Sequence, residues 1–92
     1  MDSSQQLVSN YVRFFLDKEG GAIRFVPKRD RDGRMCWEVF GIFPDGNEQQ
    51  VKLSKTGHPK ILKSADALVA YWQSLYPEAT EVSIPILSTH TK

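Results

Sequence analysis

Apolar residues recur with helical spacing between residues 5 and 18. They occupy positions i, i+1, i+4, i+5 and i+8, which is the pattern of an amphipathic helix. The residues on this face are Leu7, Val8, Tyr11, Val12 and Phe15. Gly20 and Gly21 follow, and glycine adopts the left-handed conformation that ends helices at little steric cost. The sequence therefore predicts an N-terminal helix over 5–18.

Three stretches with strand-like patterns follow this helix. They predict strands over 22–27, 35–43 and 48–54. A charged loop at 28–34 joins the first two, and a Pro-Asp-Gly-Asn turn joins the second and third. Because both connections are short, we expect a meander of three antiparallel strands, the first of which stops at Pro27.

A second amphipathic stretch precedes a short apolar run near the C-terminus. Ser64 is a suitable N-cap for a helix over 64–76, since its side-chain oxygen can accept from a free N–H of the first turn. Trp72 lies in the middle of the apolar face, so we expect its ring to pack on the sheet. Residues 80–87 predict a last strand. Pro85 cannot donate a main-chain hydrogen bond, which favours an edge position for that strand.

The order of elements is helix, three-stranded antiparallel meander, helix and edge strand (αβββαβ). It predicts a single α+β domain over 5–87, with the helices packed on one sheet face and flexible tails at 1–4 and 88–92. The 92 residues are 40% hydrophobic and 25% charged, which is typical of a folded globular domain and not of a disordered chain. No apolar run approaches the roughly 20 residues of a membrane helix. One cysteine allows no internal disulfide and favours a cytoplasmic location.

Lysines and alanines recur before and within the second predicted helix. The spacing of Lys60, Lys63, Ala67 and Ala70 resembles the lysine-and-alanine signature of double-stranded RNA-binding domains. The first five predicted elements also occur in the same order in that family, where both helices cover one face of an antiparallel sheet. A proline and a leucine interrupt the signature here, so we assign the chain to no family.

Few residues could carry catalysis or hold a metal. Cys36, His58 and His90 are the only cysteine and histidines, and no pair of them has the spacing of metal ligands. Cys36 is expected to be a small buried strand residue and not a nucleophile. Glu38 is the one charge in its strand, and we expect it to be solvated or paired with a cross-strand lysine. We therefore expect no enzyme activity, no cofactor and no metal site.

Positive charge is concentrated in the middle of the chain. Residues 24–63 hold nine Lys or Arg against five Asp or Glu, although the whole chain has a net charge of only +1. In a three-stranded meander, the loops 28–34 and 55–63 lie at the same end of the sheet. We expect a non-catalytic module that binds nucleic acid through these loops, with Asp30 and Asp32 offsetting part of the field. The candidate residues are Lys28, Arg29, Arg31, Arg34, Lys55, Lys60 and Lys63.

The strand over 35–43 is apolar on both of its faces. One layer of helices covers only one face of a sheet, so the other face is available to a partner. Trp37, Phe40 and Ile42 are the candidate interface residues. The alternative function is therefore a protein–protein interaction module, an inhibitor, adaptor or assembly subunit, and we expect a protein partner or a homodimer. No membrane contact is expected.

Overall fold

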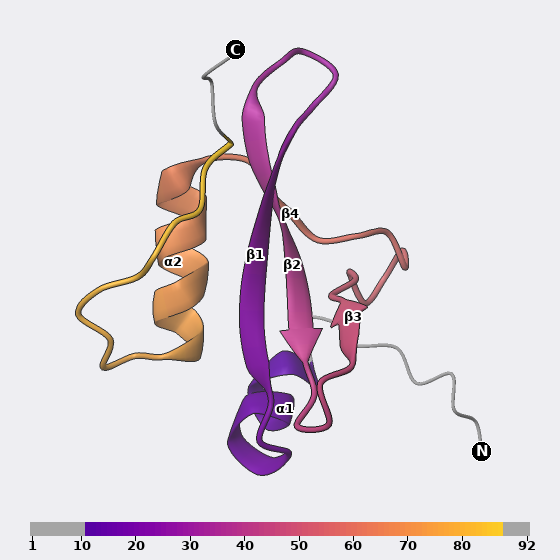
Figure 1. Ribbon diagram of the computed structural model, residues 1–92, viewed down its shortest axis with the longest axis vertical. Coiled ribbons are helices and arrows are strands. Elements are labelled where there is room, and N and C mark those ends of the chain that lie inside the picture. Colours follow the sequence, from indigo (N-terminus) through magenta and orange to yellow (C-terminus); the bar gives the residue numbers. More distant parts are fainter. Residues whose placement is uncertain (1–10, 88–92) are drawn as a thin grey trace.

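A computed structural model describes residues 11–87 and shows an α+β fold. Its six elements, in chain order, are α1 (Val12–Lys18), β1 (Ala22–Arg29), β2 (Met35–Ile42), β3 (Glu48–Gln50), β4 (Ile61–Leu62) and α2 (Ala65–Leu75). Strands β1, β2 and β3 form the predicted antiparallel meander, and β4 also pairs with β2. The hairpin between β1 and β2 and the helix α1 lie at opposite ends of the sheet (Figure 1). The predicted tails and the start of the first helix fall outside the described residues.

The predicted third strand is interrupted. β3 pairs with residues 40–42 of β2 and β4 with residues 37–38, so the two short strands lie in line along the same edge. Between them the chain leaves the sheet as a side hairpin, residues 52–59, whose ends form an isolated bridge between Lys52 and Pro59. The expected strand over 48–54 is therefore wrong beyond Val51, because the polar residues that follow turn outward at Gly57, where φ is +75°.

Strand β1 continues through Pro27 and does not stop there. The N–H of Val51 donates to the carbonyl of Val39 (2.8 Å). The main-chain N–H and carbonyl of Val39 therefore point toward the third strand, and they point away from Phe25, its partner on β1. In an antiparallel ladder these orientations alternate, so Phe25 and, two residues on, Pro27 turn their main-chain groups to the free edge. A missing N–H at Pro27 therefore breaks no hydrogen bond of the ladder.

Residues 80–87 form no strand, which corrects the prediction of a fourth strand at a sheet edge. They follow α2 as an extended segment that we call the C-terminal segment. The indole N–H of Trp37 donates to the carbonyl of Pro85 (2.7 Å), and Val82 and Ile84 pack against the core. The fourth strand of the sheet is instead β4, which precedes α2.

Both helices pack on the same face of the sheet, as predicted. Phe15 of α1 meets Phe43 edge to face, with ring centroids 4.8 Å apart, and Trp72 of α2 meets Phe25 in the same way at 5.9 Å. Ser64 caps α2, because its hydroxyl accepts from the N–H of Ala67. The buried core consists of Val12, Phe15, Phe25, Trp37, Val39, Val51, Leu62, Leu68 and Leu75.

Gly21 allows the close approach of α1 to the sheet. A Cβ atom at this position would overlap the ring of Phe15, which is fully buried. The predicted role of Gly20 also holds, since it has a φ of +72° directly after the end of α1. The two glycines thus have different functions: Gly20 turns the chain, and Gly21 makes room for a core side chain.

Candidate nucleic-acid interface

The loop predicted at 28–34 is the end of a two-stranded ribbon. β4 pairs with residues 37 and 38 of β2. Residues 35 and 36, which precede Trp37 at the start of β2, therefore pair with β1 alone. The register extends to the pair Arg29 and Met35, and Figure 1 shows this end of the hairpin projecting past α2. We call residues 28–34 the basic hairpin.

Asp30 organises the turn of the basic hairpin. Its Oδ1 accepts from the N–H of Asp32 (2.9 Å) and from the N–H of Arg34 (3.0 Å). The main chain closes the same turn, since the N–H of Asp30 donates to the carbonyl of Arg34 and the N–H of Gly33 to the carbonyl of Asp30. The left-handed φ of Gly33, +82°, completes the reversal. Asp30 is thus a structural residue of the turn as well as a negative charge beside the arginines.

The four basic side chains of this hairpin differ in their surroundings. Lys28 pairs with Glu38 across the strands, at 3.1 Å between Nζ and Oε2, which confirms the expected cross-strand partner of Glu38. Arg29 donates from Nη1 to the carbonyl of Gly33 (3.0 Å). Arg31 and Arg34 are exposed and form no ion pair with any other residue in the range 11–87. These two guanidinium groups at the tip are therefore available to an external anion, since no acidic side chain within residues 11–87 pairs with them.

The three candidate lysines of 55–63 are spread over different elements. Lys55 is exposed in the side hairpin, and Lys63 is exposed between β4 and α2. Lys60 is half-buried, with its Nζ 5.0 Å from the ring centroid of Tyr71, so its charge lies over an aromatic face. The sequence did not single out Tyr71, because neighbours that belong to different elements leave no periodic signal.

The structure brings only part of this basic set together. Leu62 pairs with Trp37, so Lys63 follows at the base of the basic hairpin. The side hairpin branches off at the level of Val39 and lies beside the sheet edge, well away from the hairpin tip (Figure 1). Lys55 is therefore separated from the arginines, whereas Lys63 is the one of these three lysines that the strand register places nearest to the basic hairpin.

The three residues proposed for the partner interface do not share one face of the sheet, because successive side chains of a strand point to opposite faces. Trp37 is 5% exposed and belongs to the core, which corrects its assignment to an interface: it lies on the helix-covered face together with Val39. Phe40 and Ile42 lie on the opposite face and are half-buried. The guanidinium of Arg24 lies 5.5 Å from the ring centroid of Phe40 and is paired with Glu48.

The predicted candidates for catalysis or metal binding were the single cysteine and the two histidines. Cys36 is a buried free cysteine, as expected from its strand position. No group of three or more Cys, His, Asp or Glu side chains suited to a metal occurs within residues 11–87, and His90 lies outside this range. None of the helices described is long and apolar enough to cross a membrane.

Comparisons with protein-family models, curated proteins and solved structures give no match for this chain. The resemblance to double-stranded RNA-binding domains is thus limited to the predicted order of elements and four residues, and in the structure β4 stands between the meander and α2.

Proposed function

We propose that the protein is a non-catalytic module that binds nucleic acid through the basic hairpin. The observation that carries this proposal is the pair of exposed arginines, Arg31 and Arg34, at the tip of a projecting two-stranded ribbon. Guanidinium groups donate two parallel hydrogen bonds and match the geometry of phosphate oxygens. Lys63 at the base of the ribbon adds a further positive charge near the basic hairpin.

The magnitude of the charge sets the expected strength of binding. A net charge of +1 gives little long-range attraction, and Asp30 and Asp32 oppose phosphate at the hairpin itself. We expect dissociation constants of roughly micromolar order at low salt, within the range of non-specific binding. Because phosphate contacts release counterions, the affinity should fall steeply as salt is added.

Fluorescence anisotropy with duplex DNA, duplex RNA and single strands tests the proposal at about 50 mM salt. Arg31→Ala and Arg34→Ala should each weaken binding and lower the salt slope by about 1. Lys18→Ala is the matched control, because it removes one exposed positive charge from α1 at the opposite end of the sheet. Absence of binding to all of these nucleic acids, or an equal effect of Lys18→Ala, contradicts the proposal.

The second candidate function is protein association through Phe40 and Ile42. It is favoured by their position on the sheet face opposite the core, where both remain partly accessible. In that case the protein sediments as a dimer, or as a complex with its partner, at about micromolar concentration. Phe40→Lys should then give a folded monomer. A wild type that stays monomeric and finds no partner through this face removes the second candidate.

A further inference from the structure

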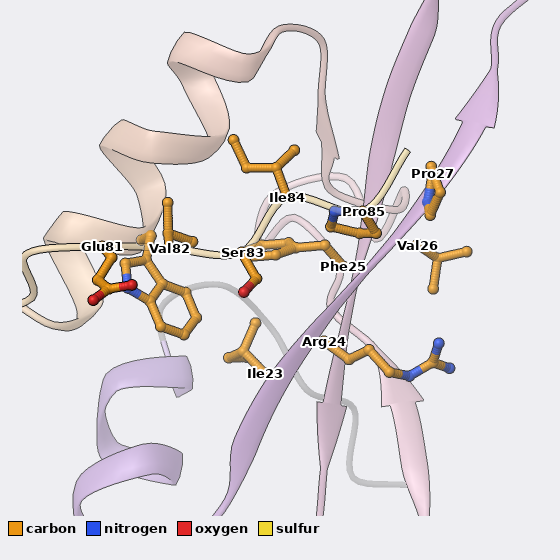
Figure 2. Close-up of a pocket in the computed structure, with 11 residues that line it drawn as sticks. Ile23, Arg24, Phe25, Val26, Pro27, Glu81, Val82, Ser83, Ile84 and Pro85 are labelled. Atoms are coloured by element: carbon orange, nitrogen blue, oxygen red, sulfur yellow. The ribbon is translucent and has the colours of Figure 1, made fainter. Parts of the chain in front are cut away.

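A groove of about 720 Å³ lies between β1 and the C-terminal segment. One wall is formed by residues 23–27 of β1 and the other by residues 81–85, with Trp72 between them. Figure 2 shows Ile23 and Phe25 pointing toward the C-terminal segment, whereas Arg24 and Val26 point to the other side of the strand. Because side chains from both faces of β1 line the groove, it follows the edge of this strand and not one face of the sheet.

The main chain of β1 is open to this groove. Within residues 11–87, β1 is an edge strand whose only neighbour in the sheet is β2. The orientation of Val39 makes Phe25 turn its N–H and carbonyl outward, and by alternation Ile23 does the same. Among the described residues, no main-chain hydrogen bond joins the C-terminal segment to these two positions. The edge therefore offers donors and acceptors at the spacing of a strand.

The C-terminal segment stays apart from β1 and leaves this space open. The carbonyl of Pro85 accepts a hydrogen bond from the indole N–H of Trp37, which fixes this end of the segment. Pro85 itself has no N–H with which to continue a ladder. Toward Glu81 the chain lies beside α2 (Figure 2). The groove thus has one wall with unused main-chain groups and a second wall that carries the apolar side chains Val82 and Ile84.

The charges at the groove favour a basic occupant. Arg24 is committed to an ion pair with Glu48, so its charge is largely balanced. Glu81 is exposed and has no ion-pair partner within residues 11–87. The unbalanced charge of the lining is therefore negative, and it lies at the end of the groove away from Pro85.

We propose that this groove binds an extended peptide that adds to β1 as a strand, with apolar side chains at alternate positions and a basic residue beside Glu81. Five residues of strand, the length of the wall at 23–27, span about 16 Å. Main-chain pairing along an open edge, with side-chain pockets at every second residue, is the general mode of strand addition. A small ligand would not satisfy groups spaced two residues apart along a strand.

A second copy of the protein is a less suitable occupant. In a two-fold dimer through β1, each edge would bring its own C-terminal segment to the same place, since an isologous interface repeats every element. The two segments would then meet each other before the two strands could pair. A single extended chain avoids this conflict.

Amide hydrogen exchange followed by NMR tests the proposal. The probe is the acetylated and amidated peptide Lys-Val-Thr-Val-Thr-Val. Without peptide, the amides of Ile23 and Phe25 should exchange quickly, and saturating peptide should slow both about tenfold or more. The amides of Arg24 and Val26, which face β2, serve as internal controls and should change little. Unchanged exchange at Ile23 and Phe25 with the peptide in excess overturns the proposal.

Two further measurements separate the other possible occupants. If Ile23 and Phe25 are already protected in the monomeric protein without peptide, the protein's own chain occupies the edge. If sedimentation shows a dimer in which the same amides are protected, a second copy does. Either result overturns the peptide proposal.

Glu81→Gln should weaken binding of the probe about threefold, whereas the nearby Glu78→Gln, outside the groove, should not. Equal effects of the two variants contradict the placement of the basic residue beside Glu81.

Discussion

The indole N–H of Trp37 donates to the carbonyl of Pro85 at 2.7 Å, across 48 positions of the sequence. Trp37 belongs to the central strand and is almost completely buried, so this bond satisfies a polar group that would otherwise be costly in the core. The same bond holds the C-terminal segment beside the sheet. It therefore links the stability of the core to the shape of the groove at β1.

Trp37→Phe should destabilise the protein by about 1–2 kcal/mol beyond the effect of lost ring volume, because the carbonyl of Pro85 loses its donor. The methyl NMR signals of Val82 and Ile84 should also shift, because the bond to Pro85 positions the segment that carries these side chains against the core. Trp72→Phe is the matched control, since the indole N–H of Trp72 has no hydrogen-bond partner among the described residues. Chemical denaturation measures the loss of stability, and NMR spectra measure the change in the C-terminal segment. If the two variants behave alike, the bond to Pro85 contributes nothing measurable.

Gly21→Ala should destabilise the protein by about 1–3 kcal/mol, because the added methyl group overlaps the fully buried ring of Phe15. Chemical denaturation gives the change in the free energy of unfolding. Phe15→Leu makes room at the same contact. The cost of Gly21→Ala should therefore be smaller in the Phe15→Leu background than in the wild type. Additive effects would show that the two residues are not in contact.

Tyr71→Phe should make the protein less sensitive to alkaline pH. Burial, with a smaller contribution from Tyr76, raises the pKa of Tyr71 to about 12. The folded state thus favours the neutral phenol, while the unfolded chain ionises near its ordinary pKa of about 10. Stability that is present below pH 10 is lost as the pH rises toward 12, on the order of 2 kcal/mol for this group.

Denaturation of wild type and Tyr71→Phe in parallel, at pH 7 and between about pH 10 and 12, checks this expectation. At pH 7 the variant should lie within about 1 kcal/mol of the wild type, because the hydroxyl of Tyr71 has no hydrogen-bond partner among the described residues. An identical alkaline loss in both proteins would mean that Tyr71 ionises equally in the folded and unfolded states.

Asp30→Asn should strengthen nucleic-acid binding if the basic hairpin is the site. The amide keeps an oxygen that can accept from the N–H groups of the turn, and the change removes a negative charge beside Arg31 and Arg34. Asp45→Asn is the matched control, because Asp45 accepts from the N–H of Asn47 in a similar turn at the other end of the sheet. Anisotropy titrations should show tighter binding for Asp30→Asn alone. Equal gains would indicate a general effect of net charge.

Local patterns predicted the elements of this fold well. Ser64 was identifiable as a cap because its role depends only on the next three residues. The packing of Trp72 against the sheet followed from its place on one helical face. The sequence predicted that Glu38, a single charge in an apolar strand, would be solvated or paired with a cross-strand lysine. The structure identifies that lysine as Lys28. These features depend on short segments whose periodicity is visible along the chain.

The features that sequence reasoning missed depend on pairing between distant segments. Pro27 ends a strand only where its missing N–H faces a neighbour, and the sequence does not show which side of β1 is free. Residues 80–87 have the alternation of a strand, but Pro85 accepts from the indole of Trp37, and within residues 11–87 no main-chain hydrogen bond joins this segment to the sheet. For the basic residues, the sequence indicated charge but not that Lys28 is paired or that Lys60 lies over Tyr71.

The interrupted third strand makes residues 52–60 a removable insertion. Val51 bonds to Val39, and Ile61 pairs with Glu38, the neighbouring position on β2. A chain shortened to join Val51 directly to Ile61 would therefore continue the ladder without a change of register, and Leu62 would still face the core. By the same geometry, residues added within the side hairpin leave the sheet untouched. The fold thus carries a segment whose length can vary in evolution or by engineering while the surrounding strands keep their partners.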